Sequence, residues 1–284
     1  MALLVGLLRL GYHQLVVCHF NHGLRPADAE REARLVRSAA GEMPVEEGWG
    51  DVASHARESG LSIEIAAREL RLRFFEACSK AHRCRRVLLA HHAGDQVETI
   101  LLNLFRGTGL AGLCGMRPVS RVGGLDLLRP MLGIARAEVR FFVESEGIAF
   151  SEDPSNQSPA HARNRVRHEL IPLVQSIFGE AAPSVVLRMA RMLADEEAFI
   201  SENVPALPRE IPLGQLTGLH PALRARAVLE WLRRSGVPEP GARETMAVLS
   251  LLDIAGGPAK VNLPGGLHAR RRAGQIFLEG IDCG

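Results

Sequence analysis

Residues 87–116 are the part of the sequence that most constrains the fold. Residues 87–90 are apolar on both faces and therefore predict a buried parallel strand. A polar turn follows, and then a helix whose apolar residues recur at a spacing of three or four. This predicted stripe consists of Val97, Ile100, Leu101 and Leu104. Gly107 follows as a C-cap residue would, so the stretch predicts one strand–turn–helix unit of a parallel sheet.

The polar turn holds the residues that can do chemistry. His91 and His92 end the predicted strand, and Asp95 and Glu98 lie three apart on the first helical turn, away from the apolar stripe. Ligands bind beyond the carboxyl ends of strands in such sheets, and carboxylates suit Mg²⁺ held by a nucleotide phosphate. The turn therefore predicts a binding site with Asp95 as a magnesium ligand. The alternative is an acidic pair that only stabilises the helix dipole, beside histidines that only cap the strand.

The composition is that of an ordinary globular protein. The chain has 284 residues, of which 46% are hydrophobic and 23% charged, and this length predicts about two domains. A formal charge of +2 does not by itself indicate nucleic acid, but all basic side chains except Lys80 and Lys260 are arginines, which bind phosphate in two-pronged fashion. The five cysteines contain no C-x-x-C pair, which favours reduced thiols in a cytoplasmic protein and disfavours zinc and iron–sulfur sites. No apolar run is long enough to span a bilayer, so we expect no membrane partner.

Strands and helices alternate through the first half of the chain. Strands are predicted at 15–20, 45–49 and 125–128, and further helices at about 28–40, 63–82 and 135–146. This alternation predicts an α/β fold with a doubly wound parallel sheet. The chain opens with a helix at 1–10 and no strand before it, so we expect a missing strand and a missing phosphate-cradling loop in front of that helix.

The helix at 63–82 is predicted to bury one face and to expose another. The buried face is expected to contain Ile63, Ala67, Leu70, Phe74 and Ala77. Arg68 and Arg71 also lie on this helix, and a solvated face is favoured over a functional role for both, because exposed arginines are ordinary. The glycine-rich residues 107–124 predict a loop.

A second basic cluster follows the polar loop at 151–160. Arg163 and Arg167 lie four apart on one helix face, Arg165 lies on another, and Val166, Leu170 and Leu173 are expected on the buried side. Guanidinium groups at a helix start oppose the dipole, which favours an anionic partner, with a solvated basic face as the alternative.

The remaining residues predict helices at 183–203, 215–235 and 243–255, and short strands at 261–263 and 276–278. Three prolines mark 204–213 as a linker. Arg270, Arg271 and Arg272 lie between the two strands and are candidates to meet a phosphate backbone. We therefore expect an N-terminally incomplete α/β domain at 1–155, a helical connection at 156–210 and a small α+β domain at 211–284.

Four motifs, which follow one another along the chain in the family's own order, resemble one family. The sequence AHHAGDQVETILLNLFRGTGLAGLCGM at 90–116 resembles the second signature of the N-type ATP pyrophosphatases, the PP-loop superfamily, in the form used by the tRNA(Ile)-lysidine synthases. NHGLRPADAEREA at 21–33 resembles an earlier segment of that family, and EDPSN at 152–156 with RNRVRHELIPLV at 163–174 resembles a later signature. NLPGGLHARRR at 262–272 is similar to its tRNA-facing region. The implied fold is adenine nucleotide alpha hydrolase-like, followed by a mostly helical tRNA-facing domain.

This resemblance implies a two-step ligase. ATP, as co-substrate with Mg²⁺, activates carbon 2 of the wobble cytidine in tRNA(Ile) with a CAU anticodon, and free L-lysine then attacks the adenylated base to give lysidine and AMP. Asp95 and Glu98 would hold the cytosine, the metal or the amine, and His91 would lie beside the nucleotide. Nucleotide binding is implied for His22, His92, Arg106, Gly107 and Gly109. Contact with phosphate or tRNA is implied for Arg163, Asn164, Arg165, Arg167, Arg270 and Arg271. The oligomeric state stays open.

The sequence departs from the family pattern in two places. No phosphate loop of the type serine-glycine-glycine-any-aspartate-serine precedes Met1, and Gly94-Asp95 stands where the family usually has two aspartates. Two other interpretations therefore stay open: a non-catalytic tRNA-binding remnant, which the absent loop favours, and another PP-loop tRNA-modifying enzyme. Thiolation enzymes that use a cluster need a C-x-x-C pair, which this sequence lacks.

Overall fold

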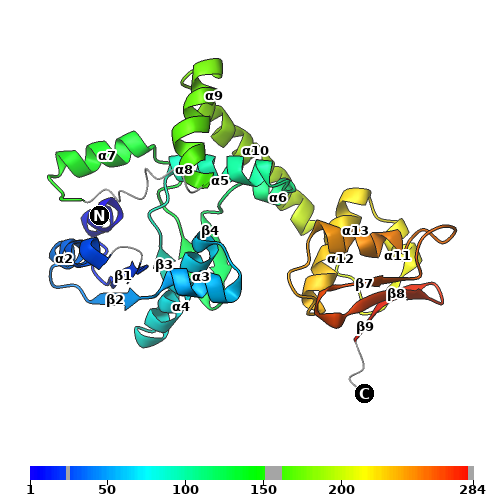
Figure 1. The fold of residues 1–284 in the computed structure, drawn as a ribbon. Helices are drawn as coiled ribbons and strands as arrows, with labels where there is room; N and C mark the ends of the chain where they lie inside the picture. Colours follow the sequence, from blue (N-terminus) through cyan, green and yellow to red (C-terminus); the bar gives the residue numbers. More distant parts are fainter. Residues whose placement is uncertain (24–25, 151–161, 281–284) are drawn as a thin grey trace. The chain divides into compact units, whose positions relative to one another are not determined.

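The computed structural model describes residues 1–23, 26–150 and 162–280, which form two compact units, Met1–Ala194 and Asp195–Gly284 (Figure 1). The predicted polar loop at 151–160 and its EDPSN motif lie outside the described residues. The expected three-part division at 155 and 210 stays a prediction.

The strands of the first unit are mostly parallel. β1 (Val17–Asn21) pairs in parallel with β2 (Val45–Trp49), and β3 (Arg86–Leu88) pairs in parallel with β5 (Leu125–Leu128). β4 (Val119–Val122) adds an antiparallel edge to β5. Among the described residues these strands form two sheets, ordered β1-β2 and β3-β5-β4. The predicted α/β class with parallel strands is confirmed.

Helices of the first unit precede, separate and follow these strands in the chain. Their bounds are α1 (Ala2–Arg9), α2 (Pro26–Ala40), α3 (Val52–Ser59), α4 (Ile63–Ala81), α5 (Ala93–Phe105), α6 (Leu110–Leu113) and α7 (Arg136–Ser145). The predicted helices at 1–10, 28–40, 63–82 and 135–146 are confirmed within a few residues. The expected loop at 107–124 is wrong in part, because it contains α6 and β4, and β4 turns into β5 at Gly123, whose φ is 58°.

Helix α4 packs against both sheets. Its Phe74 ring lies 5.5 Å from the Phe20 ring of β1, while Phe75 packs in a core cluster with Leu125 and Leu127 of β5. The helix begins after Ser62, whose hydroxyl accepts the Ile65 N–H in the manner of an N-cap residue.

The predicted buried face of α4 is partly wrong. Ala77 is exposed, and the buried positions are Ala66 and Phe75. Ala66 is buried because it packs with Val52 and Ala56 of α3, a helix that the sequence analysis did not predict.

The central strand and helix also differ in detail from their prediction. β3 is short and its residues are exposed or half-buried, and Ala90 is exposed. In α5, Val97 and Ile100 are buried as expected, but Leu104 is 49% exposed because the end of the helix is not covered. Glu98, expected to point away from the buried stripe, is only 2% exposed.

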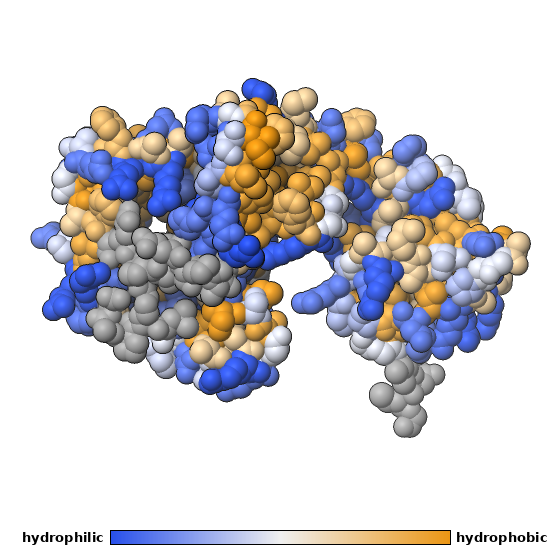
Figure 2. Space-filling model, turned by 45° about the horizontal axis from the view of Figure 1, so that its top comes forward, coloured by the Kyte–Doolittle hydropathy of each residue, from blue (hydrophilic) through white to orange (hydrophobic). Residues whose placement is uncertain are grey.

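Residues 162–202 are helical except for a break at 179–181. α8 (Ala162–Arg165), a π-helical turn η2 (Val166–Leu170) and α9 (Ile171–Phe178) follow one another, and α10 (Ala182–Glu202) confirms the predicted helix at 183–203. Val166 is buried as expected, but Leu173 is exposed. Leu173 belongs to an apolar surface over α9 and α10 (Figure 2) that also contains Ile177, Phe178, Met189 and Met192.

No single described helix is long and apolar enough to cross a membrane. Ala162–Phe178 and Ala182–Glu202, which are bent by 97° relative to each other, pass that test only as a pair.

The second unit is a four-stranded antiparallel sheet packed on helices. The sheet order is β6-β9-β8-β7, from β6 (Ile211–Pro212), β7 (Lys260–Asn262), β8 (His268–Arg272) and β9 (Gln275–Glu279). The helices are α11 (Leu213–Thr217), α12 (Pro221–Arg234) and α13 (Ala242–Ser250), and η3 (Pro264–Gly266) follows β7. The core contains Ile211, Leu216, Val228, Trp231, Leu232, Val248, Leu251 and Ile276.

Three expectations for this unit are corrected. The proposed linker at 204–213 contributes Leu207 and Ile211 to the core, because Ile211 pairs with Ile276. The helix expected at 215–235 is two helices, since Pro221 starts α12 at a position where proline is favoured. The helix expected at 243–255 ends at Ser250.

Candidate functional site

The turn between β3 and α5 is fixed by reciprocal hydrogen bonds. The His92 backbone N–H donates to Asp95 Oδ2 at 2.9 Å, and the Asp95 backbone N–H donates to His92 Nδ1 at 3.3 Å. His92 is thus the N-cap of α5, and the pair forms a capping box. A Cβ at Gly94 would lie 2.9 Å from the His92 ring, so a larger residue there would require the ring to move. This local geometry holds Asp95 and Glu98 at the carboxyl end of β3.

Glu98 is paired with two arginines from a distant part of the chain. Glu98 Oε2 accepts Arg163 Nε–H at 2.7 Å, and Glu98 Oε1 accepts Arg167 Nε–H at 2.5 Å. The two arginines lie on α8 and η2, 65 and 69 positions away. The structure thus unites two clusters that the sequence predicted separately. Glu98 is buried because these guanidinium groups compensate its charge.

Asp95 is held more loosely in the same cluster. Its Oδ1 accepts Arg167 Nη2–H at 3.2 Å and Arg163 Nη2–H at 3.4 Å. These bonds are longer than the bonds to Glu98, and therefore weaker. Asp95, Glu98, Arg163 and Arg167, here called the charged quartet, carry two negative and two positive formal charges.

His91 lies beside the quartet as a neutral imidazole. Its pKa is lowered to about 4, chiefly by burial and further by the charges of Arg129, Arg163 and Arg71, while the Asp95 carboxylate acts in the opposite direction. Its Nδ1 is buried without a hydrogen-bond partner among the described residues. An imidazole that is neutral at pH 7 and has an unused nitrogen can accept or donate one hydrogen bond to a ligand.

Arg68 and Arg71 add positive charge that the described residues do not compensate. Burial lowers the pKa of the Arg71 guanidinium, and the neighbouring Arg68 and Arg163 lower it further. No carboxylate in the described part of the chain pairs with Arg68 or Arg71. The interpretation of Arg71 as a solvated side chain is therefore wrong, since an arginine that is desolvated and unpaired favours an anionic ligand.

Arg129 is a further buried arginine, and the sequence patterns did not predict a role for it. It is buried, and its Nη1 donates to the Arg117 carbonyl at 2.8 Å and to Ser120 Oγ at 2.9 Å. The signal that could have found it is its position directly after β5, the strand beside β3, since the carboxyl ends of parallel strands meet at one edge. For Arg71, the comparable signal is its spacing of three from Arg68.

The predicted nucleotide-binding residues are not all brought together. His92 caps α5, and His22 follows β1 with its ring 5.1 Å from that of Phe20. Arg106 and Gly107 lie at the other end of α5, roughly 16 Å along the helix axis from Asp95, and Gly109 is the N-cap of α6. Their predicted role therefore gains no support from proximity to the quartet.

The other residues predicted to contact phosphate or tRNA differ in their surroundings. Arg165 is exposed and pairs with Glu169 at 2.9 Å, one helical turn away, while Asn164 is half-buried. In the second unit, Arg270 Nη1 lies 3.3 Å from Glu279 Oε1, and Arg271 Nη1 donates to two backbone carbonyls.

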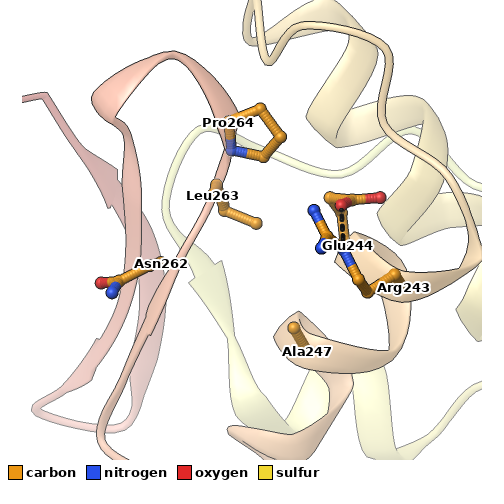
Figure 3. A pocket seen from close by; sticks show the side chains of 6 residues that line it. All are labelled: Arg243, Glu244, Ala247, Asn262, Leu263 and Pro264. Atoms are coloured by element: carbon orange, nitrogen blue, oxygen red, sulfur yellow. Dashed lines mark hydrogen bonds and ion pairs between the residues drawn. The ribbon is translucent and has the colours of Figure 1, made fainter.

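Two hollows lie apart from the quartet. One of about 210 Å³ lies at the carboxyl ends of β1 and β2 and is lined by His19, Asn21, Ala29, Glu30, Ala33, Arg37, Glu47, Gly48 and Trp49. The other, of about 520 Å³, lies in the second unit between α13 and the end of β7 (Figure 3) and is lined by Arg243, Glu244, Ala247, Asn262, Leu263 and Pro264. Neither includes a member of the quartet.

The quartet does not fit a magnesium ion bound by Asp95. Asp95 Oδ1 already accepts from two guanidinium groups, and Oδ2 accepts from the His92 N–H. In the described part of the chain, no group of three or more His, Cys, Asp or Glu side chains is arranged to hold a metal ion. The predicted magnesium ligand is therefore not supported by this geometry.

The neutral state of His91 predicts a pH dependence of stability. Its pKa is 6.5 when unperturbed and about 4 in the folded chain, so the unfolded chain binds a proton that the folded chain excludes between these values. Stability should fall as the pH falls from 6.5 towards 4 and level off below, with a total contribution of at most about 3 kcal/mol. In His91→Asn, urea unfolding across this pH range should show a shallower fall, and an unchanged slope would contradict the assignment. Slopes are compared because asparagine also changes the packing at every pH.

The fold and the charged site at the end of β3 define a PP-loop nucleotide-binding protein. Residues 1–174 match the family model of the PP-loop domain, and residues 212–277 match that of the TilS substrate binding domain. The chain is 36% identical over 270 residues to the tRNA(Ile)-lysidine synthase of Salinispora arenicola, with 91% of this chain and 80% of the relative covered. It therefore belongs to the tRNA(Ile)-lysidine synthase family.

Two further matches set the extent of the similarity. The tRNA(Ile)-lysidine synthase of Geobacter sulfurreducens is 40% identical over 207 residues, which cover 72% of this chain but 43% of that relative. The chain thus aligns with less than half of that longer protein. The U34-tRNA thiolase NcsA from Methanococcus maripaludis, solved with its [4Fe-4S] cluster, has a TM-score of 0.53 at 12% identity and covers 68% of each chain. At that identity it shows a shared fold.

Proposed function

We propose that this chain catalyses the ATP-dependent ligation of free L-lysine to carbon 2 of the wobble cytidine in tRNA(Ile) with a CAU anticodon. ATP, L-lysine and the cytidine would give lysidine, AMP, pyrophosphate and one proton. The cytidine oxygen at carbon 2 would leave on the phosphate of AMP as the new carbon–nitrogen bond forms. The names of the relatives support this reaction, and ATP is the nucleotide that the PP-loop family uses.

The observation that carries the proposal is the uncompensated positive charge beside the quartet. Arg163 and Arg167 are neutralised by Asp95 and Glu98, but Arg68 and Arg71 have no carboxylate partner among the described residues. A net positive site attracts a triphosphate, and it stabilises the charge that develops as the phosphorus–oxygen bond breaks. We assign the binding of ATP phosphates to Arg71, with Arg68 beside it.

The two carboxylates are given different roles because their bonds differ. Glu98 is buried and accepts short bonds, so it is a positioning residue that fixes Arg163 and Arg167. Asp95 accepts longer bonds, so it can exchange a guanidinium for the ammonium of lysine or the amino group of cytosine. Neutral His91 would then hydrogen-bond the base or nucleotide through its free nitrogen.

The metal ion, the two other substrates and the cellular location are also part of the proposal. Mg²⁺ would arrive with the phosphates of ATP and is assigned no ligand in this chain. Free lysine, the CAU-bearing tRNA and a cytoplasmic location are inferred from the family.

The test is the transfer of labelled lysine to a tRNA(Ile) transcript with a CAU anticodon, in the presence of ATP and Mg²⁺. We expect acid-precipitable label and an equal amount of AMP. The matched substrate is the same transcript with uridine at the wobble position, which should accept no label. AMP formation without transfer, or equal labelling of both transcripts, would reject the proposed reaction.

A further inference from the structure

Helix α4 packs on one face of the β1–β2 pair. Because side chains alternate along a strand, Cys18 and Phe20 of β1 share a face. The parallel register places Glu46 and Gly48 of β2 beside them. The Phe20 and Phe74 rings lie 5.5 Å apart, and a Cβ at Gly48 would lie 2.5 Å from the Phe74 ring. The face that contains Cys18 is therefore the face on which α4 lies.

The side chains of α4 and β1 meet at a matched spacing. Phe74, Cys78 and His82 follow one another at intervals of four positions, so they line one side of the helix about 6 Å apart. Cys18 and Phe20 are two positions apart on a strand, which corresponds to about 7 Å. Because Phe74 packs on Phe20, the next position on the same side of the helix brings Cys78 to Cys18.

The two thiols are in contact, as this spacing requires. The Cys18 S–H donates a hydrogen bond to the Cys78 sulfur. One helical turn further along, His82 Nε2 lies 2.7 Å from Glu46 Oε1, so the end of α4 is held on β2 beside the cysteines. Cys18 is exposed and Cys78 is half-buried. A small molecule in solution can therefore reach the pair.

The surroundings of the pair favour a sulfur–sulfur bond over a metal ion. Within 1–23, 26–150 and 162–280, no group of three or more His, Cys, Asp or Glu side chains could hold a metal ion. The pKa of the Cys18 thiol is raised to about 12, chiefly by desolvation and further by the neighbouring Cys78 and Glu46. Surroundings that disfavour a thiolate give the reduced pair no added stability, whereas a disulfide carries no charge.

We propose that Cys18 and Cys78 form a reversible disulfide that joins β1 to α4 when the chain meets a low-molecular-weight disulfide such as oxidised glutathione. One protein thiol attacks the small disulfide, which gives a mixed disulfide and releases one reduced small thiol. The other protein thiol then attacks the mixed disulfide and releases the second small thiol. The protein pair thus loses two electrons and two protons, and the small disulfide gains them.

The bond would close a loop of about 60 residues and restrict the unfolded chain accordingly. It would also fix the helix that carries Arg68 and Arg71. Neither cysteine belongs to the charged quartet, so this inference does not depend on the proposed reaction. Reversible bonds of this kind occur in cytoplasmic proteins whose thiols are otherwise reduced.

The first test is a peptide map of the full chain after incubation with oxidised glutathione. Free thiols are blocked with iodoacetamide, and a tryptic digest is analysed by mass spectrometry without reduction. Cleavage after Lys80 and Arg83 separates Cys78 from Cys84, the exposed thiol that could compete with it. We expect one internal cross-link, between the peptides that contain Cys18 and Cys78, and its loss on treatment with dithiothreitol. Glutathione attached singly without a cross-link, or a cross-link to Cys84, would overturn the proposal.

The second test compares thermal unfolding before and after oxidation. The Tm of the wild-type chain should rise by about 5 °C or more, because the cross-link restricts the unfolded state. Cys78→Ser should show no such rise, whereas the matched control Cys84→Ser should keep both the rise and the cross-link. A rise in Cys78→Ser, or its absence in Cys84→Ser, would assign the effect to another thiol. The peptide map uses the wild-type chain, so it decides the bond even where a variant folds poorly.

Discussion

Replacing Glu98 by glutamine is expected to lower the free energy of unfolding by about 3–5 kcal/mol. Glu98 is 2% exposed and accepts the Nε–H groups of Arg163 and Arg167. Glutamine has nearly the same volume, so the substitution removes the charge without creating a cavity. The two guanidinium groups would then lack their main counter-charge in a poorly solvated place, where the desolvation penalty is no longer offset. Urea unfolding at pH 7 measures the difference.

Glu169→Gln is the matched control for this prediction. Glu169 also pairs with an arginine of the same segment, Arg165, but the two side chains are 54% and 63% exposed. An exposed pair of this kind contributes about 0–1 kcal/mol, and added salt screens it further. Similar losses in the two variants would show that burial does not strengthen the Glu98 pairs. The double variant Glu98→Gln/Arg163→Gln should lose less than the sum of its single variants, because it removes both ends of one bond.

The local pattern of α5 predicted this helix well but could not predict the state of Glu98. Val97 and Ile100 are buried because they follow the helical period, and Gly107 follows the helix end with φ of 75°. The same pattern assigns a carboxylate to the solvated side. Glu98 is buried only because two arginines reach it from 65 and 69 positions further along, and no local spacing contains that contact.

The prediction of a solvated Arg71 side chain is wrong for a related reason. An arginine on an amphipathic helix is usually solvated, and this expectation outweighed its spacing of three from Arg68. Its desolvation depends on how α4 lies relative to the segment that carries Arg163. The arginine run at 270–272 shows the opposite case. Once this segment is known to be a strand, alternation alone separates Arg271 from its neighbours.

Long-range pairing also explains why the predicted linker at 204–213 was wrong. Prolines at 205, 208 and 212 are typical of a linker, yet Ile211 is fully buried because β6 pairs with β9. The break before α12 could have been predicted, since proline at the first helical position is a local signal.

Replacing Arg71 by glutamine is expected to reduce lysine transfer by at least about 100-fold while leaving Tm unchanged or higher. The guanidinium lies desolvated beside Arg68 and Arg163, so its charge costs stability in the free chain. The same uncompensated charge would stabilise the phosphates of ATP when they bind. Loss of function without loss of stability therefore distinguishes a ligand-binding arginine from a structural one. Initial rates of label transfer and thermal unfolding are measured on the same preparation.

Arg73→Gln on the same helix is the control for Arg71. Arg73 is 66% exposed and lies 3.8 Å from Glu69, so its loss should change neither rate nor Tm appreciably. Arg71→Lys should recover part of the rate, because lysine keeps the charge but not the two-pronged geometry. The KM for ATP should rise in both Arg71 variants. A Tm that falls in Arg71→Gln, with a rate that recovers at lower temperature, would instead assign Arg71 to the structure of the site.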